Sequence, residues 1–308
     1  MITVRVPAKV NVQLGVGGLR ADGFHDLANV FFAVALGDEV TASAAGPGEG
    51  VTLTCSGPDA AAVPLDGSNL AARAARLLAA RHGLGEPDVR LHIAKAIPVA
   101  GGMAGGSADG AAALVACDAL WELGTPAGTL LELAAELGSD VPFALLGGVA
   151  LGRGRGEILD PLPVTGTFHW VFAVADGGLS TPAVFRECDR LREEAGTGSG
   201  DTEVPTPDAD PALLAALADG DPVALAGALA NDLQSAALSL RPSLAATLRA
   251  GTEAGALGAL VSGSGPTCAF LAKDAEAAAA VAEALRESGT CRTAHATYGP
   301  VPGAGVLP

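Results

Sequence analysis

The sequence predicts an α+β protein divided into two lobes, and three observations lead to this prediction. The chain has 308 residues, which is enough to bury a large core and to form two lobes. An apolar strand-like run at residues 89–94 leads through a glycine-rich loop into an alanine-rich run that favours a helix. The second half is expected to follow the order strand–helix–helix–strand–strand–helix–strand, which packs helices on one face of an antiparallel sheet.

Strict alternation of apolar and polar residues predicts the first strand at residues 3–14. Lys9 and Asn11 fall on its polar face, about 7 Å apart given the rise of a strand. That face is either ordinary exposed surface or part of a site, and the strand alone does not decide. A turn is expected at Asp22-Gly23, and further strands at residues 29–36, 39–44 and 51–54.

Three helices are expected around the glycine-rich loop. Ser68 is expected to cap a helix over residues 69–82, a second helix covers residues 108–123, and a third covers residues 126–137. Asp140 is expected just past the third helix, on a short loop, because Pro142 prevents the helix from continuing. Asp140 either caps a turn or presents a carboxylate toward the glycine-rich loop.

The second half is expected to begin after a lobe boundary near residues 157–167, giving domains at residues 1–157 and 158–308. The run at residues 168–175 is apolar enough for a central strand, and the glycine stretch at residues 257–271 is either a hairpin or a backbone that closes over a ligand. Residues 195–210 have the composition of a surface loop. The remaining expected elements are strands at residues 150–156 and 291–298 and helices at residues 182–194, 211–219, 222–229, 232–240, 242–254 and 275–287.

Composition and charge exclude several classes of function. The net charge of −16 argues against nucleic-acid binding, which depends on lysine and arginine neutralising phosphates. We find no apolar stretch long enough to span a membrane and no signal-peptide pattern. Five scattered cysteines without a Cys-x-x-Cys pair indicate reduced thiols and a cytoplasmic protein.

The glycine-rich loop, residues 98–107, is the strongest functional signal. Glycines let backbone N–H groups approach an anion, and the first turn of the following helix favours negative charge. Ser107 stands where a P-loop has lysine, and Met103 and Ala104 break the dinucleotide-binding register, which excludes nicotinamide-dependent oxidoreduction. The sequence therefore predicts a phosphate-binding loop whose cation comes from elsewhere in the chain.

Three stretches together resemble the GHMP kinase superfamily: residues 7–11 its first motif, residues 98–107 its phosphate loop and residues 260–266 its third motif. Within it, residues 20–27 and 138–143 resemble the branch that phosphorylates the C2 hydroxyl of 4-diphosphocytidyl-2-C-methyl-D-erythritol in the non-mevalonate route to isoprenoids. The resemblance implies an N-terminal ATP-binding lobe similar to ribosomal protein S5 domain 2, a ferredoxin-like C-terminal α/β lobe and a cleft between them. It also implies ATP as co-substrate, Mg²⁺, a small-molecule substrate with a cytidine diphosphate group, and a monomer or homodimer.

The resemblance assigns roles to residues at matching positions. Asp140 would be the general base and Lys9 its cationic partner. The expected ATP-binding residues are Asn69, near the adenine, together with Pro98, Val99, Ala100, Gly101, Gly102, Met103, Ala104, Gly105, Gly106 and Ser107. The expected substrate-binding residues are Asn11, Phe24, His25, Phe185, Gly263, Ser264 and Gly265, of which Phe24, His25 and Phe185 would hold the cytosine.

The chain departs from the family pattern at several of these positions. Phe24 replaces a usual tyrosine, Ala100 and Ala104 replace frequent glycines, and Ala108 replaces a serine that could help hold Mg²⁺, which leaves Ser107 and water as metal ligands. A mevalonate- or homoserine-type kinase of the same superfamily, and a non-catalytic nucleotide-binding protein on the same fold, are the alternatives. The first would lack the cytosine-binding aromatic residues, and the second would not need both Lys9 and Asp140.

Overall fold

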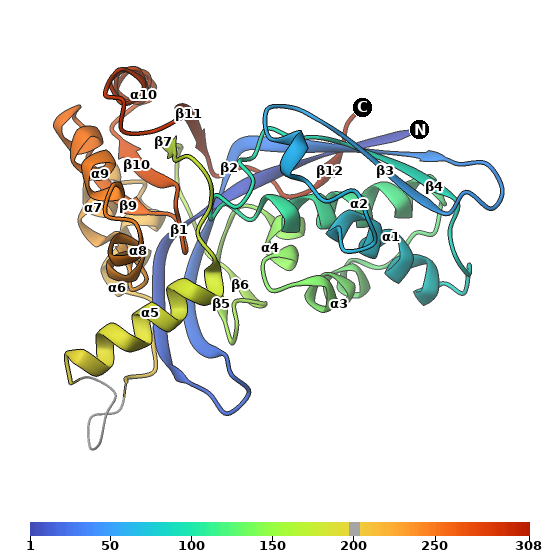
Figure 1. Cartoon of the computed structure of the whole chain (residues 1–308), viewed down its shortest axis with the longest axis horizontal. Helices are drawn as coiled ribbons and strands as arrows, with labels where there is room; N and C mark the ends of the chain where they lie inside the picture. The colour runs from blue at the N-terminus through green and yellow to red at the C-terminus, as the bar shows by residue number, and fades with distance from the viewer. Residues whose placement is uncertain (197–203) are drawn as a thin grey trace.

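A computed structural model describes residues 1–196 and 204–308 of the chain, and these residues form two sheets with helices packed around them (Figure 1). The division of an α+β fold into two sheets agrees with the prediction from sequence. The larger sheet has the order β12-β1-β2-β4-β3, with β5 and β6 extending from β2 and β8 pairing with β1. The smaller sheet has the order β11-β7-β10-β9 and is antiparallel throughout.

The strands of the larger sheet are β1 (Ile2–Leu19), β2 (His25–Ala44), β3 (Val51–Ser56), β4 (Val89–Ala94), β5 (Val149–Arg153), β6 (Ile158–Pro161), β8 (Ala230–Asn231) and β12 (Gly305–Val306). Those of the smaller sheet are β7 (Phe168–Val174), β9 (Gly258–Val261), β10 (Cys268–Ala272) and β11 (Thr293–Gly299). The helices are η1 (Ala60–Ala62), α1 (Leu70–Arg81), α2 (Gly105–Leu120), α3 (Ala127–Leu137), α4 (Val141–Leu146), α5 (Thr181–Glu194), α6 (Pro211–Asp219), α7 (Pro222–Ala228), α8 (Gln234–Leu240), α9 (Leu244–Glu253) and α10 (Ala275–Glu287).

The long hairpin of β1 and β2 runs through the middle of the molecule and connects its two halves. In Figure 1, α1 to α4 lie on one side of this hairpin and α6 to α10 on the other. The polar face of β1 is exposed only near its start, at Arg5: Lys9, Asn11 and Gln13 are all buried, because other segments cover both faces of this part of the strand. The two strands expected at residues 29–36 and 39–44 are one continuous strand, β2, with a register shift opposite Pro7 and Ala8.

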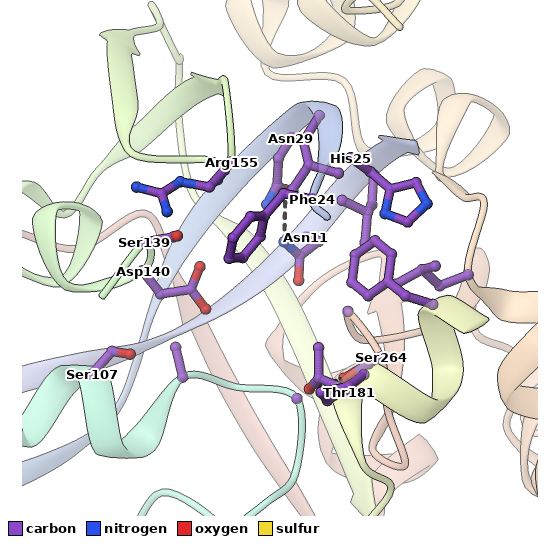
Figure 2. A pocket seen from close by; sticks show the side chains of 18 of the residues that line it. Asn11, Phe24, His25, Asn29, Ser107, Ser139, Asp140, Arg155, Thr181 and Ser264 are labelled. Carbon is purple, nitrogen blue, oxygen red and sulfur yellow. Dashed lines mark hydrogen bonds between the residues drawn. The ribbon is translucent and has the colours of Figure 1, made fainter. Parts of the chain in front are cut away.

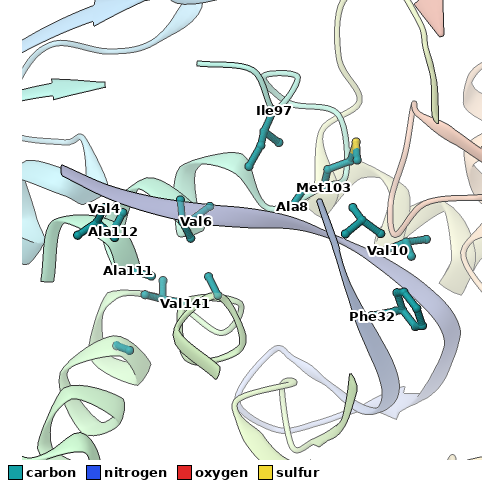
Figure 3. Close-up of a cluster of buried hydrophobic side chains, with 14 of the residues drawn as sticks. Val4, Val6, Ala8, Val10, Phe32, Ile97, Met103, Ala111, Ala112 and Val141 are labelled. Carbon is teal, nitrogen blue, oxygen red and sulfur yellow. The ribbon is translucent and has the colours of Figure 1, made fainter. Parts of the chain in front are cut away.

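Small side chains allow α2 to pack closely on β1. Alternate residues of β1, including Val4 and Val6, meet the alanines of α2, among them Ala111 and Ala112, in the main hydrophobic core (Figure 3). The helix is buried around most of its circumference, as expected for a run with few polar residues. This packing holds the first turn of α2 in a constant position relative to β1.

The smaller sheet joins the larger one through aromatic contacts. The Phe32 ring on β2 lies 5.8 Å from the Phe168 ring and 5.8 Å from the Trp170 ring, both on β7. Helices α9 and α10 pack against this sheet. The strand β7 is central in its sheet, which confirms the prediction from its apolar sequence.

Three local predictions were wrong, each for a reason visible in the structure. Asn69, not Ser68, caps α1 by accepting a hydrogen bond from the N–H of Ala71, while the Ser68 hydroxyl donates to Asp66. Helix α2 begins at Gly105 rather than 108, so the end of the glycine-rich loop is already helical. Pro142 does not end a helix but lies in the first turn of α4, a position that proline favours.

The proposed lobe boundary at residue 157 stays a prediction. Strands β6 and β12, which follow that position, pair with β5 and β1 of the larger sheet. The surface loop expected at residues 195–210 includes residues 197–203, which lie outside the described residues. Within the described ranges, we find no helix with the length and apolar character needed to span a membrane.

Candidate active site

A cavity of about 890 Å³ lies where the two halves meet, and most of the predicted site residues line it (Figure 2). Its walls come from β1, the β1–β2 hairpin, the glycine-rich loop, the start of α4, the β5–β6 turn and α5. The predicted residues on its lining are Lys9, Asn11, Phe24, His25, Ala100, Gly101, Gly102, Ala104, Gly105, Gly106, Ser107, Asp140, Phe185, Gly263 and Ser264. The folded chain thus brings together segments that are far apart in sequence.

The polar face of β1 forms one wall of the cavity. Lys9 donates from Nζ to Asn11 Oδ1 at 2.6 Å and to the carbonyl oxygen of Gly102 at 3.1 Å. Asn11 in turn donates to Asn29 Oδ1 on β2 at 2.6 Å. The strand face that sequence left undecided is therefore a buried hydrogen-bond chain that leads to the glycine-rich loop.

Asp140 faces this chain from the start of α4. Its Oδ2 lies 3.9 Å from Lys9 Nζ, and a third of its side chain is exposed (33%). Its carboxylate does not cap α4, so its oxygens stay available to the cavity. Burial lowers the pKa of Lys9, and the nearby charge of Asp140 opposes that effect without cancelling it.

The loop at residues 262–265 closes over the glycine-rich loop. The Ser262 hydroxyl donates to the carbonyl oxygen of Gly102 at 3.2 Å, and a Cβ on Gly102 would overlap the Ser262 carbonyl oxygen. Gly263 has a φ of 55° and lies against Asn11 and Lys9. Position 102 therefore requires glycine, and a side chain at position 263 would crowd Asn11 and Lys9.

The glycine-rich loop enters α2 through a left-handed residue. Ala104 precedes the helix with a φ of 58°, and Ala100 has a φ of 54°, so the two alanines that replace glycine adopt a conformation that glycine prefers. The first turn of α2, with Gly105, Gly106 and Ser107, borders the cavity. Its free N–H groups and the helix dipole favour an anion there.

Aromatic residues line the opposite end of the cavity. The His25 and Phe185 rings stack, with centroids 5.1 Å apart and an angle of 27° between their planes. Phe24 is 49% exposed, and the Arg155 guanidinium lies 5.0 Å from its ring centroid. This end of the cavity offers ring faces and a cation, whereas the other end offers backbone N–H groups and Lys9.

Five predicted residues lie off the cavity lining. Met103 is buried in the main core, and its carbonyl accepts a hydrogen bond from the Lys9 N–H, so it supports the loop. Asn69 is buried, and its amide is used by the cap of α1 and by the Pro64 carbonyl. The remaining three, which neighbour lining residues in the chain, are Pro98, Val99 and Gly265.

Sequence reasoning missed six polar lining residues: Asn29, Ser139, Arg155, Thr181, Arg186 and Asp189. Asn29 carried a signal, because it is the polar first residue of an otherwise apolar predicted strand. Asp189 follows Phe185 by four residues, which places both side chains on one face of a helix. Arg155 and Thr181 carried none, since each lies near a turn where polar residues are common.

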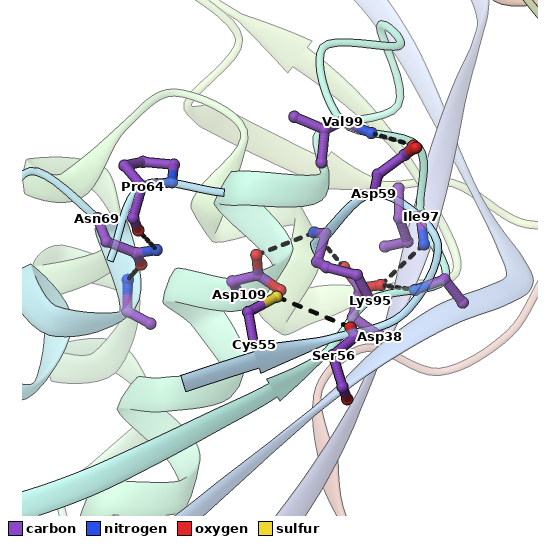
Figure 4. Close-up of polar contacts among 12 residues, drawn as sticks. Asp38, Cys55, Ser56, Asp59, Pro64, Asn69, Lys95, Ile97, Val99 and Asp109 are labelled. Carbon is purple, nitrogen blue, oxygen red and sulfur yellow. Dashed lines mark hydrogen bonds and ion pairs between the residues drawn. The ribbon is translucent and has the colours of Figure 1, made fainter. Parts of the chain in front are cut away.

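A second lysine lies behind the glycine-rich loop, away from the cavity (Figure 4). Lys95 Nζ lies 2.5 Å from Asp38 Oδ2 and 2.9 Å from Asp109 Oδ2, and all three side chains are buried. Asp38 also accepts hydrogen bonds from the N–H groups of Ala96 and Ile97. This group, the Lys95 cluster, connects the entry of the glycine-rich loop to α2.

Comparison with known proteins identifies the family. Residues 69–148 match the GHMP kinases N terminal domain, and residues 213–291 match the GHMP kinases C terminal domain. A 4-diphosphocytidyl-2-C-methyl-D-erythritol kinase of Streptomyces avermitilis is 68% identical, with 99% of each chain covered. One of Mycolicibacterium smegmatis is 57% identical, with 100% of this chain and 92% of the relative covered.

Solved structures agree with these relatives. A crystal structure of 4-(cytidine 5'-diphospho)-2C-methyl-D-erythritol kinase superposes with a TM-score of 0.76 at 35% identity, covering 96% of this chain and 99% of the other. A homoserine kinase of Cytophaga hutchinsonii superposes with a TM-score of 0.74 at 22% identity, covering 99% and 97%, which shows a shared fold only. The chain therefore belongs to the 4-diphosphocytidyl-2-C-methyl-D-erythritol kinases of the GHMP kinase superfamily.

Proposed function

We propose that this kinase transfers the γ-phosphoryl group of ATP to the C2 hydroxyl of 4-diphosphocytidyl-2-C-methyl-D-erythritol, with Asp140 as general base and Lys9 as its cationic partner. The products are the 2-phosphate and ADP, and the step belongs to the non-mevalonate route to isoprenoid precursors. The observation that carries the proposal is the placement of the Lys9–Asp140 pair in one cavity with the glycine-rich loop, with 3.9 Å between Nζ and Oδ2.

Asp140 would take the proton of the C2 hydroxyl as the oxygen attacks the γ-phosphorus. The new bond forms between that oxygen and phosphorus, the bond from phosphorus to the β–γ bridging oxygen breaks, and ADP leaves. A carboxylate in hydrogen-bond reach of the hydroxyl accelerates such a step by about 10²–10⁴-fold. Asp140 suits this role because no helix cap occupies its oxygens.

Lys9 would supply the cation that the glycine-rich loop lacks. Burial lowers its pKa in the protein alone, and the negative charge of the nucleotide phosphates would favour its ammonium form again. Its bonds to Asn11 and to the Gly102 carbonyl hold Nζ between the base and the loop. Phosphoryl transfer depends mainly on such positioning and charge stabilisation.

The residues on this lining fit a Mg²⁺ ion that arrives with ATP. Mg²⁺ is usually held by one or two carboxylates together with substrate phosphates and water, rather than by a complete protein cage. The described residues contain no group of three or more histidine, cysteine, aspartate or glutamate side chains placed to hold a metal. The Ser107 hydroxyl borders the cavity and would hold the ion together with water, and the ion would neutralise charge on the phosphates of the nucleotide.

The substrate-binding end would hold the cytidine diphosphate group. Phe24 and Phe185 offer ring faces to the base, and stacking on an aromatic side chain is worth about 1–3 kcal/mol per base. Arg155 and Arg186 line the same cavity in a chain of net charge −16, where they would offset the repulsion of a diphosphate. The cytoplasmic location and the monomeric or homodimeric state stay predictions.

An ATP-consumption assay with purified protein tests the proposal. The cytidyl substrate is compared with methylerythritol phosphate, mevalonate and homoserine, and the product is examined by ³¹P NMR. We expect turnover with the cytidyl substrate alone and a new phosphomonoester at C2. Equal turnover of mevalonate or homoserine, or phosphate at another hydroxyl, would contradict the proposal.

A further inference from the structure

We propose that Asp189 determines which base the kinase accepts by holding His25 in the tautomer whose Nδ1 is a hydrogen-bond acceptor. This inference rests on the proposed function, because it assumes that the cytosine binds at the aromatic end of the cavity. Asp189 is a positioning residue in this account, since it acts through His25 and not on the reacting atoms.

The His25 ring is held at two places by one helix. Phe185 and Asp189 lie one turn apart on α5, so both side chains face the β1–β2 hairpin where His25 begins β2. Phe185 stacks on the ring, and Asp189 Oδ1 lies 2.9 Å from His25 Nε2. The stack restricts the ring plane, and the hydrogen bond selects which edge of the ring faces the helix.

The chemistry of a carboxylate decides the tautomer. An ionised carboxylate can only accept hydrogen bonds, so His25 Nε2 must carry the proton that is donated to Asp189. In the neutral imidazole, Nδ1 is then a bare acceptor. Within the described part of the chain, the His25 ring has Asp189 as its only hydrogen-bond partner, which leaves Nδ1 without an intramolecular donor.

An acceptor at this position discriminates between pyrimidines. Cytosine carries an amino donor on C4, whereas uracil carries a carbonyl acceptor there. A neutral His25 with an unprotonated Nδ1 can accept a hydrogen bond from the cytosine amino group. With uracil, Nδ1 and the carbonyl oxygen would both be acceptors, so no hydrogen bond would form and their lone pairs would repel each other. Leaving such a buried polar group unpaired costs about 1–3 kcal/mol, which corresponds to about 5–150-fold in affinity.

Burial makes the hydrogen bond of Asp189 effective. The His25 side chain is 6% exposed, so water cannot readily replace a missing partner at Nε2. The Asp189 side chain is 30% exposed and lies on the outer part of the lining, so its substitution should leave the fold intact. The effect of replacing Asp189 is therefore expected in base selection and not in stability.

Asp189→Asn tests the inference, because asparagine keeps the shape and can donate a hydrogen bond to Nε2, which would move the ring proton to Nδ1. We expect the ratio of kcat/KM for the cytidyl substrate to that for its uridyl analogue to fall by about 10-fold or more. The KM for ATP should stay within about 2-fold, and Asp189→Glu should restore most of the ratio. Because the asparagine oxygen can also accept from Nε2, Asp189→Leu, which has no hydrogen-bonding group, is measured beside it. An unchanged ratio in an active Asp189→Leu enzyme would overturn the inference.

Phe24→Ala is the matched control, because Phe24 offers a ring face to the base and is not the residue that stacks on His25. Stacking is tolerant of base identity, so this variant should weaken both pyrimidine substrates by similar factors and leave their ratio nearly unchanged. In a His25→Ala background, Asp189→Asn should have no further effect on the ratio. A persistent effect there would show that Asp189 contacts the base directly and would refute its role as a positioning residue.

A spectroscopic measurement tests the tautomer without any substrate. In ¹⁵N-histidine-labelled enzyme, the His25 signals, assigned by comparison with His25→Ala, should report protonated Nε2 in the unmodified enzyme and protonated Nδ1 in Asp189→Asn. The opposite assignment in the unmodified enzyme would overturn the inference. If the unmodified enzyme shows the expected tautomer but no activity with the cytidyl substrate, the proposed function is wrong. The assignment of the His25 tautomer to Asp189 would still hold in that case.

Discussion

Lys9 and Lys95 are both buried lysines beside aspartates, but their surroundings differ in a way that separates chemistry from support. Lys95 has two carboxylates at 2.5 and 2.9 Å, whereas Lys9 has one at 3.9 Å. Burial acts against the charged form of both lysines. At Lys95 the charges of Asp109 and Asp38 outweigh burial and raise its pKa, while at Lys9 burial dominates and the pKa falls.

The contrast shows which of the two lysines can still interact with a ligand. Lys95 is paired with two carboxylates and lies off the cavity, so it anchors the glycine-rich loop to α2. The positive charge of Lys9 is only partly compensated by Asp140, so negative charge that enters the cavity would stabilise the ammonium form of Lys9. Such an arrangement, a buried and incompletely paired cation next to a carboxylate that is open to solvent, is expected at a site that binds an anionic ligand.

Asp140→Asn should give the largest change, because it removes the base but keeps the shape of the side chain. We expect kcat to fall by about 10³-fold, within the usual range for loss of a general base, while ATP affinity stays within about 3-fold. Steady-state kinetics and nucleotide titration measure the two effects. The matched control is Asp219→Asn at the exposed end of α6, and full activity of Asp140→Asn would refute the assignment.

Lys95→Met should destabilise the protein by about 3–5 kcal/mol, because it leaves two buried carboxylates without their cation. Lys9→Met should change the free energy of unfolding by about 1 kcal/mol or less, since Asp140 is partly hydrated, while kcat falls. Urea denaturation of both variants compares the two clusters directly. A larger loss of stability in Lys9→Met than in Lys95→Met would reverse our assignment of roles.

The stability of the Lys95 cluster should depend on pH through Asp109. Burial raises the pKa of Asp109 to about 7 from its ordinary value of 3.8, against the opposing charge of Lys95. Between these values the folded protein binds more protons than the unfolded chain, so this group makes the protein less stable as pH rises from about 4 to about 7.

Asp109→Asn removes this titration. The difference in free energy of unfolding between the variant and the unmodified protein should move in favour of the variant by about 1 kcal/mol or more between pH 4 and pH 8. Denaturation at a series of pH values measures it. A difference that is constant over this range would show that Asp109 titrates normally.

Ala104→Gly should have the smallest effect, and it tests the loop that connects the two clusters. Relief of the left-handed conformation gains about 1–2 kcal/mol, and the greater freedom of glycine in the unfolded chain costs about 0.4–1 kcal/mol. We expect a net gain in stability of about 1 kcal/mol or less, measured by urea denaturation together with ATP affinity. A marked loss of stability would indicate that the Ala104 side chain packs usefully at the start of α2.

Prediction from sequence succeeded where the signal is local or where several motifs agree. The alternation in β1 placed Lys9 and Asn11 on one face, and the 2.6 Å hydrogen bond between them confirms it. The family, the fold and the activity followed from five motifs in order and are confirmed by the relatives. The roles of individual site residues stay predictions that the cavity supports by bringing most of them together.

Prediction failed where a short segment has several local solutions. The proline at 142 ends helices and also begins them, and only the packing of α4 against α2 and α3 decides between the two. Ser68 and Asn69 are both good caps, and the buried position of Asn69 against the Pro64 carbonyl selects it. Asp189 was missed although it shares a helix face with Phe185, because a helical aspartate is ordinary until the histidine that it contacts is known.

Residue type and spacing along the chain are enough to identify the glycine-rich loop, the strand that carries Lys9 and the order of the motifs. The contacts of Lys9 with Asp140, of Lys95 with its two aspartates and of Asp189 with His25 arise only in the folded chain. Each of these depends on burial and on distances between segments that are remote in sequence. The strength of a charge interaction is set by that environment, which local sequence does not contain.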